Sequence, residues 1–221
     1  MKHTGRLTVF ILLLSVVPCV YLAAIWKNIP ATVPLHFGLN MQADRIGDKT
    51  QMILPTALFV VVTLCVYFLL VNLHRIDPKR VKMQDSSRYE KLATGISVFM
   101  TIMNFIVILS CVRGPIVMKH VLFPLLGLLL AFIGNYMHTI KPNYFAGMRL
   151  PWTLSDDENW RKTHLVAGKL WFWCGIAFAL SSLFIPAQFC LFIFIPFIVI
   201  ITLIPATYSY WLFKQKNQAG S

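Results

Sequence analysis

Six long apolar stretches dominate the chain and alternate with shorter polar connectors. They cover residues 7–26, 52–73, 92–112, 120–138, 165–185 and 189–213. A helix needs about 20 apolar residues to cross the ~30 Å hydrocarbon layer of a membrane, and each stretch has about that length. None shows the two-residue alternation of a barrel strand. The pattern therefore predicts an all-α integral membrane protein with six transmembrane helices.

The composition supports this fold class. The 221 residues are 57% hydrophobic and 13% charged, whereas a soluble domain has about 25% charged residues. The mean hydropathy is +0.69. All five cysteines fall inside apolar stretches and lack the spacing of metal ligands, so we predict no metal site, no disulfide framework and no cofactor.

The chain divides into two sequence regions. Residues 1–91 contain two predicted helices, an outward loop at 27–51 and a basic loop at 74–91. Residues 92–221 contain four predicted helices and a polar connector at 139–164. We expect one membrane domain without a large soluble module.

The Lys and Arg residues are distributed unequally between the two sides of the predicted membrane. The N-terminus, second connector, fourth connector and C-terminal tail hold two, six, five and two of them, so 15 of the 20 lie on one side. The other connectors hold three, two and none. Because cytoplasmic loops carry the excess of positive charge, both termini are predicted to be cytoplasmic. Membrane topology thus accounts for the net charge of +12, and direct nucleic-acid binding is not predicted.

The fourth connector is the segment richest in polar, aromatic, Gly and Pro residues. Pro142 ends the preceding helix, because proline lacks an N–H donor and disfavours helix in the residue before it. Gly147 permits a turn. Ser155-Asp-Asp-Glu158 is typical of a capping box, with acidic side chains at the positive end of the helix. We expect a helix that begins near Asp156 and continues unbroken into the fifth apolar stretch.

The start of this helix has two interpretations. Trp160, His164 and Gly168 share one face by their i, i+4 spacing. The segment is either an anchor in the lipid headgroup layer, with cations on anionic lipid, or a cytoplasmic ligand or docking site. Candidate residues for such a site carry polar, aromatic or small side chains near this membrane face: Asn135, Asn143, Arg149, Trp152, Asn159, Trp160, Arg161, Lys162, His164 and Gly168.

Two stripes of small residues predict close helix packing. Gly127, Ala131 and Asn135 repeat every four residues on the fourth apolar stretch. Gly175, Ala179 and Ser182 form a similar stripe on the fifth. Small side chains let membrane helices approach closely, so we expect these two helices to pack against each other.

The outward connector combines turn residues with charged side chains. Its Gly and Pro residues predict turns, and Asp44 with Arg45 and Asp48 with Lys49 are expected to pair locally. The acidic residues of this connector lack the spacing of an EF-hand calcium loop, and no metal role is predicted. The candidate residues for contact with an outer ligand are His36, Phe37, Asp44, Arg45, Gly47 and Lys49.

These motifs together resemble the Sdp immunity protein family. The run from Ile133-Gly-Asn-Tyr-Met-His-Thr-Ile-Lys-Pro142 to His164, ending in Ala167-Gly-Lys169, closely resembles the family signature. The motifs Pro34-x-His-Phe37 and Ala43-Asp-Arg-x-Gly-x-Lys49 resemble the N-terminal domain of unknown function of such proteins, and Ile76-Asp-Pro-Lys-Arg80 also fits. The family usually has a Gly near position 41, an aromatic residue near 46 and a small polar residue near 48. Here these positions hold Met41, Ile46 and Asp48.

The resemblance implies a multi-pass protein of the bacterial inner membrane that contacts membrane lipid and is not an enzyme. It further implies protection against a secreted, membrane-disrupting peptide toxin. A second implied role is signalling, by holding a cytoplasmic repressor at the membrane when toxin is present.

Three alternatives remain open at this point. The chain could be a transporter or lipid-binding protein whose basic cluster, Arg149, Arg161, Lys162 and Lys169, binds a phosphate headgroup at the cytoplasmic ends of helices four and five. It could be an intramembrane enzyme using His164 and Asp157, although no metalloprotease, nucleophile-elbow, Walker or dinucleotide motif is present. The fourth connector could also be purely architectural.

Overall fold

The computed structural model describes residues 2–39, 41–77, 86–114 and 116–219. Within them, six helices are long and apolar enough to cross a membrane. Their bounds are α1 (Lys2–Ile25), α2 (Ile53–Val71), α4 (Ser86–Arg113), α5 (Ile116–Met137), α7 (Asp157–Ser181) and α8 (Ala187–Ala219). Each contains one of the six predicted stretches or most of it, so the predicted six-helix membrane fold is confirmed. The sidedness of the termini stays a prediction.

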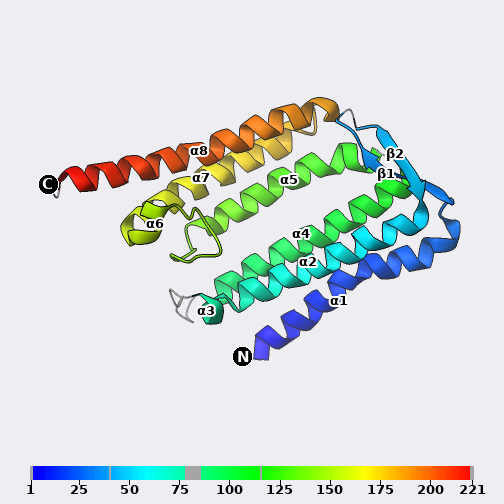
Figure 1. Cartoon of the computed structure of the whole chain (residues 1–221), viewed down its shortest axis with the longest axis horizontal. Helices are drawn as coiled ribbons and strands as arrows, with labels where there is room; N and C mark the ends of the chain where they lie inside the picture. Colours follow the sequence, from blue (N-terminus) through cyan, green and yellow to red (C-terminus); the bar gives the residue numbers. More distant parts are fainter. Residues whose placement is uncertain (1, 40, 78–85, 115, 220–221) are drawn as a thin grey trace.

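The six long helices form two groups of three (Figure 1). One group contains α1, α2 and α4, and the other contains α5, α7 and α8. The main helix contact between the groups is that of α4 with α5. The predicted boundary between residues 91 and 92 falls inside α4. Both chain termini lie toward the end of the bundle that carries the short helices α3 (Leu73–Ile76) and α6 (Pro151–Ser155), which we call the termini end.

The closest helix pair is α5 with α7, as the small-residue stripes predict. A Cβ atom added at Gly134 would lie 2.5 Å from the backbone N of Phe172. A Cβ atom added at Gly127 would lie 2.6 Å from the backbone N of Ala179. These distances leave no room for a side chain, so glycine is what allows the two backbones to touch. The stripe does not continue to Asn135, whose side chain is exposed.

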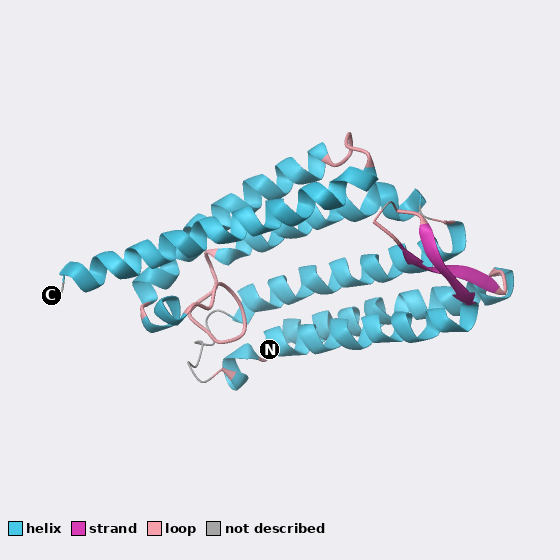
Figure 2. Cartoon of the chain, turned by 45° about the horizontal axis from the view of Figure 1, so that its top comes forward, coloured by secondary structure: helices cyan, strands magenta, loops and turns pink. Residues whose placement is uncertain are grey.

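The first connector contains a β-hairpin that the sequence reasoning missed (Figure 2). Strand β1 (Thr32–Phe37) pairs antiparallel with β2 (Ala43–Asp48), from Thr32 opposite Asp48 to Phe37 opposite Ala43. The 3-10 helices η1 (Trp26–Asn28) and η2 (Lys49–Met52) join the hairpin to α1 and α2. The hairpin marks the second end of the bundle, which we call the hairpin end.

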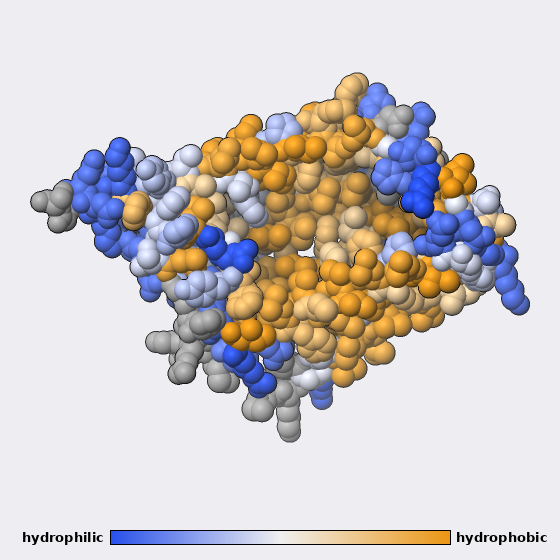
Figure 3. Space-filling model, viewed as in Figure 1, coloured by the Kyte–Doolittle hydropathy of each residue, from blue (hydrophilic) through white to orange (hydrophobic). Residues whose placement is uncertain are grey.

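The surface has the pattern of a membrane protein. Apolar side chains form a broad central band, and polar residues gather toward both ends (Figure 3). Several large apolar side chains on the long helices are open to the surroundings, with Leu13 68% and Phe192 61% exposed. Such exposure is stable only where lipid is the solvent.

Candidate functional site

Two buried polar side chains fold the fourth connector. The carboxamide of Asn143 is fully buried; its oxygen accepts the N–H groups of Phe145 (2.8 Å) and Ala146 (2.7 Å). Its nitrogen donates to the carbonyl of Lys141 (2.7 Å). The buried Thr153 hydroxyl accepts the N–H of Leu150 (2.9 Å) and lies 2.7 Å from the Met148 carbonyl. Both side chains therefore satisfy backbone groups inside the connector, and their role is to fix its shape.

Helix α7 begins one residue later than the capping-box pattern suggests. Its N-cap is Asp156, not Ser155, and the Asp156 carboxylate accepts the N–H groups of Glu158 (3.0 Å) and Asn159 (3.3 Å). A carboxylate satisfies the free N–H groups and complements the positive helix end. Ser155 instead ends the short helix α6, which the sequence reasoning did not predict.

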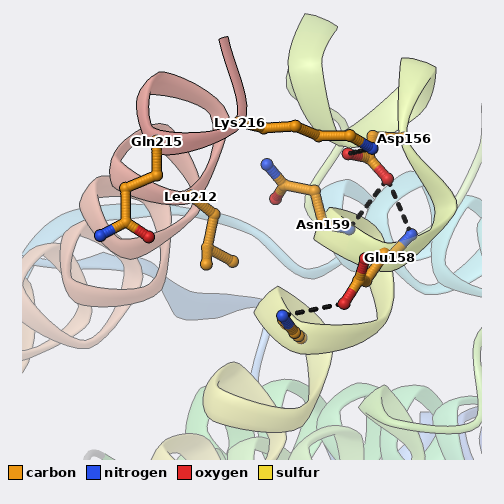
Figure 4. A pocket seen from close by; sticks show the side chains of 7 residues that line it. Asp156, Glu158, Asn159, Leu212, Gln215 and Lys216 are labelled. Carbon is orange, nitrogen blue, oxygen red and sulfur yellow. Dashed lines mark hydrogen bonds and ion pairs between the residues drawn. The ribbon is translucent and has the colours of Figure 1, made fainter. Parts of the chain in front are cut away.

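A pocket separates the start of α7 from the last turns of α8 (Figure 4). Lys216 of α8 reaches across it to the Asp156 carboxylate at 2.8 Å, and Lys162 pairs with Glu158 at 2.9 Å. The hydrogen bond from Lys216 lowers the pKa of the Asp156 carboxyl, and the two backbone donors act in the same direction. The four charged side chains that line the pocket are therefore paired with each other within the chain.

Trp160 and His164 form the buried centre of the termini end. Their rings stack with centroids 4.1 Å apart, and each side chain is 1% exposed. The indole N–H donates to the Ile140 carbonyl at 2.8 Å. The His164 Nε2 accepts the Met148 N–H at 3.0 Å, and Nδ1 lies 2.9 Å from the Trp160 carbonyl. A carbonyl can only accept, so the hydrogen bonds assign the neutral tautomer with the proton on Nδ1.

This arrangement occupies both ring nitrogens of His164 with backbone groups. Asp157, the second residue of the enzyme alternative, is exposed. Within the described ranges, no group of three or more His, Cys, Asp or Glu side chains is placed to hold a metal ion. The geometry therefore supports packing by His164 rather than proton transfer.

Ser209 of α8 receives two of the candidate side chains. The Trp152 indole N–H donates to its hydroxyl at 2.9 Å, and the Asn159 carboxamide donates to its carbonyl at 2.9 Å. Asn159 also accepts the Thr163 hydroxyl at 3.0 Å. The sequence reasoning missed Ser209. Its only distinguishing feature in the sequence is that it is a small polar residue within the aromatic run Tyr208–Trp211. These contacts attach α6 and α7 to α8.

The basic residues do not form the single cluster that the lipid alternative assumes. Lys162 is paired with Glu158, whereas Arg161 and Lys169 are exposed on α7. Arg149 lies in the connector, where its guanidinium donates to the Tyr144 carbonyl at 2.8 Å. Asn135 lines a separate pocket together with Lys169. Among the candidates, the structure thus brings together Asn143, Trp152, Asn159, Trp160 and His164 around the packed connector. Gly168 instead packs against α5 and lines the same pocket as Asn135, whereas Arg149, Arg161 and Lys162 are exposed or half-buried.

The connector is also attached to the first helix group. The buried Asp77 carboxylate, directly after α3, accepts the Tyr144 N–H at 3.1 Å. The Tyr89 hydroxyl of α4 accepts the Lys141 N–H at 3.3 Å. Asp77 belongs to the Ile76–Arg80 motif, of which residues 78–80 lie outside the described residues. The connector therefore links both helix groups at the termini end.

The hairpin uses its charged residues differently from the predicted local pairs. Asp44 pairs with His36 at 2.6 Å rather than with Arg45. Asp48 caps η2 by accepting the Thr50 hydroxyl (2.7 Å) and the Thr50 N–H (2.8 Å). The hydrogen bond from the hydroxyl, followed by that from the N–H, lowers the pKa of the Asp48 carboxyl. Lys49 donates to the Trp26 carbonyl at 3.1 Å and lies 5.1 Å from the centre of the Trp26 ring.

The remaining hairpin candidates, Phe37, Arg45 and Gly47, lie on the strands, and a Cβ atom at Gly47 would collide with Leu35.

The comparisons with known proteins cover both of these regions. The SdpI/YfhL protein family matches residues 139–209, and a domain of unknown function (DUF1648) matches residues 13–64. Immunity protein SdpI of Bacillus subtilis (strain 168) is 21% identical over 194 residues, which are 87% of this chain and 89% of that protein. The similarity to the Sdp immunity protein family is confirmed. No solved structure matches the chain significantly.

The SdpI/YfhL match contains the connector with its α8 contacts, and the DUF1648 match contains the whole hairpin. With the six apolar helices, this similarity supports a multi-pass membrane protein of the immunity type.

One hairpin residue has a backbone conformation that glycine adopts more readily than other residues. Met41, near which the resemblance leads us to expect glycine, has a φ of 58°. It is 5% exposed and packs in one cluster with Phe123, Phe178 and Cys190. The strained backbone is thus held by a side chain that fixes the hairpin to the second helix group.

Met41→Gly should therefore destabilise the protein although it relieves strain. The left-handed conformation costs a non-glycine residue about 1–2 kcal/mol, whereas loss of a buried methionine side chain costs about 2–5 kcal/mol. We expect a net loss of about 1–3 kcal/mol, measured as a lower melting temperature in detergent micelles. Leu39→Gly is the control, because Leu39 is 61% exposed on the same hairpin. An increase in stability for Met41→Gly would contradict the packing role.

Proposed function

We propose that this protein is an immunity protein of the bacterial inner membrane that protects its cell from a secreted antimicrobial peptide toxin. It acts by binding, without catalysis. The observation that carries the proposal is the similarity to immunity protein SdpI along most of both chains. The proposed orientation, with both termini in the cytoplasm, follows from the unequal distribution of Lys and Arg.

The hairpin is the proposed contact for the toxin. In this orientation the hairpin faces outward, where a secreted peptide arrives. Ile46 is 68% and Leu39 61% exposed there, so the hairpin presents two large apolar side chains outside the spanning helices. The hairpin is held by Met41 on one side and by Lys49 on the other. A fixed apolar surface can bind an apolar peptide without first being ordered.

The fourth connector is the proposed contact for a cytoplasmic repressor. Its interior is fixed by Asn143 and Thr153, while Tyr144 and Phe145 remain 48% and 36% exposed. Arg161 is exposed nearby on α7. A preformed surface with aromatic and Arg side chains has the composition of protein interfaces.

A toxin-challenge assay tests the proposal. Expression of the wild type in cells sensitive to an Sdp-type peptide toxin should raise their survival above that of cells with an empty vector. Ile46→Asp should reduce this protection, because the apolar contact is replaced by a charge. Ala43→Asp is the matched control, since it adds the same charge to an exposed hairpin position without removing a large apolar side chain.

Two outcomes would contradict the proposal at different levels. Absence of any survival gain from the wild type, with membrane expression verified, would overturn toxin protection. Full protection by Ile46→Asp would leave immunity in place but overturn the hairpin as the contact.

A further inference from the structure

An apolar cavity of about 420 Å³ lies between the two helix groups, below the fourth connector. Its walls include Leu70 of α2, Ile96 of α4, Ile133 of α5 and Ala206 of α8. The hollow between the two apolar walls is visible in Figure 3. The cavity lies among helices long and apolar enough to cross a membrane, so in a bilayer hydrocarbon is the solvent with access to it.

The cavity has one charged residue at its edge. Residues Ala146 to Leu150 of the connector cover the termini end of the cavity, and Arg149 belongs to this cover. The guanidinium is positioned by its hydrogen bond to the Tyr144 carbonyl, and the side chain remains exposed. A guanidinium has five N–H donors, so one bond to a carbonyl leaves others for a second acceptor. Its geometry suits a phosphate group.

We propose that this cavity binds one anionic phospholipid from the leaflet at the termini end. An acyl chain occupies the apolar space, and the headgroup phosphate contacts Arg149. The charge distribution predicts that this end faces the cytoplasm, where the leaflet carries anionic lipid. A phospholipid combines an apolar chain with a phosphate at the depth where the cavity and Arg149 meet. The inference does not rest on toxin protection.

The bound acyl chain would also stabilise the fold. Between the two groups, α4 and α5 make the main helix contact, and the cavity lies beside it. Hydrocarbon in this space supplies the dispersion contacts that an empty cavity lacks. The lipid therefore acts as packing material between the helix groups.

Native mass spectrometry of the full-length protein tests the site. The purified, delipidated protein is titrated with phosphatidylglycerol and, separately, with phosphatidylcholine of the same acyl chains. The wild type should bind one phosphatidylglycerol more tightly than phosphatidylcholine. Arg149→Gln should weaken phosphatidylglycerol binding about fivefold, since one cation near a lipid headgroup contributes about 1 kcal/mol. Arg149→Lys, which keeps the charge, should restore part of the preference.

Two further variants separate this site from general surface effects. Arg161→Gln removes an exposed charge from α7 outside the cavity and should leave phosphatidylglycerol binding unchanged. Ala206→Phe fills the cavity and should reduce binding of both lipids, whereas Ile204→Phe on the exposed side of α8 should not.

Equal binding by the wild type and Arg149→Gln would overturn the headgroup contact, as would an equal loss for Arg161→Gln. Unchanged binding by a folded Ala206→Phe would overturn the cavity as the acyl site. If Ala206→Phe does not fold, the Arg149 variants alone decide the proposal. The Arg149 side chain is exposed, so its substitution should leave the fold intact.

Discussion

Trp160→Ala should lower the free energy of unfolding by about 3–5 kcal/mol, the range for truncating a buried tryptophan. The indole is 1% exposed, stacks on His164 and donates to the Ile140 carbonyl. The substitution would leave a cavity, an unpaired carbonyl and a His164 ring without its stacking partner. Unfolding of the purified protein in mixed micelles, followed by circular dichroism, measures the loss.

Trp173→Ala is the matched control for this prediction. Trp173 is on the same helix but 67% exposed, so its removal should change stability by much less. The comparison also decides between the anchor and packing interpretations of Trp160. Truncation of a tryptophan that only anchors the helix in the headgroup layer would lower the free energy of unfolding very little. Small losses of similar size for Trp160→Ala and Trp173→Ala would therefore contradict the packing role.

The same variant separates architecture from function in the toxin assay. If Trp160→Ala and Asn159→Ala lose protection only in proportion to their loss of folded protein, the connector is architectural. Loss of protection by a variant with normal stability would instead indicate a docking role. The hydrogen bonds of Asn159 to Ser209 and Thr163 favour the architectural outcome for that residue.

Gly134→Val should destabilise the protein by about 3 kcal/mol, at the upper end of the cost of overpacking. A Cβ atom at Gly134 would lie 2.5 Å from the Phe172 backbone N and 2.9 Å from the Gly168 carbonyl. Both neighbours are backbone atoms of a helix, so neither can rotate away. The helices α5 and α7 would have to separate, and the melting temperature in micelles should fall.

Gly5→Val provides the control, because nothing lies within 4 Å of a Cβ atom at Gly5. This substitution adds the same side chain to helix α1 at a position with open space around it, so it should change the melting temperature very little. A tolerated Gly134→Val would show that α5 and α7 can move apart without loss, contrary to the close packing described above.

The sequence was informative about local features and less so about the partners of individual side chains. Hydropathy located all six membrane helices, and i, i+4 spacing placed Trp160 and His164 on one face, where their rings stack. The capping pattern located the start of α7 to within one residue. The hairpin was missed because Pro34, Gly38 and Gly47 indicate turns, and its two strands have only six residues each. So short a pattern carries little periodic signal.

For the candidate site, residue type predicted burial poorly. Asn143 and Asn159 are polar yet buried, because backbone groups of the connector and of α8 satisfy their carboxamides. Arg149, Arg161 and Lys169 were grouped by their proximity in sequence, but Arg149 lies in the connector, whereas Arg161 and Lys169 are exposed about two turns apart on α7.

By itself, the sequence determined the membrane fold class, the number and position of the spanning helices and the close approach of α5 to α7. These features depend on the apolar length of a segment and on the spacing of small residues, which are local properties. Only the tertiary structure decided that Ser209 binds Trp152 and Asn159, that Met41 holds the hairpin, and that a cavity lies beside Arg149. Each of these joins residues far apart in the chain, and their contacts follow from how the two helix groups pack.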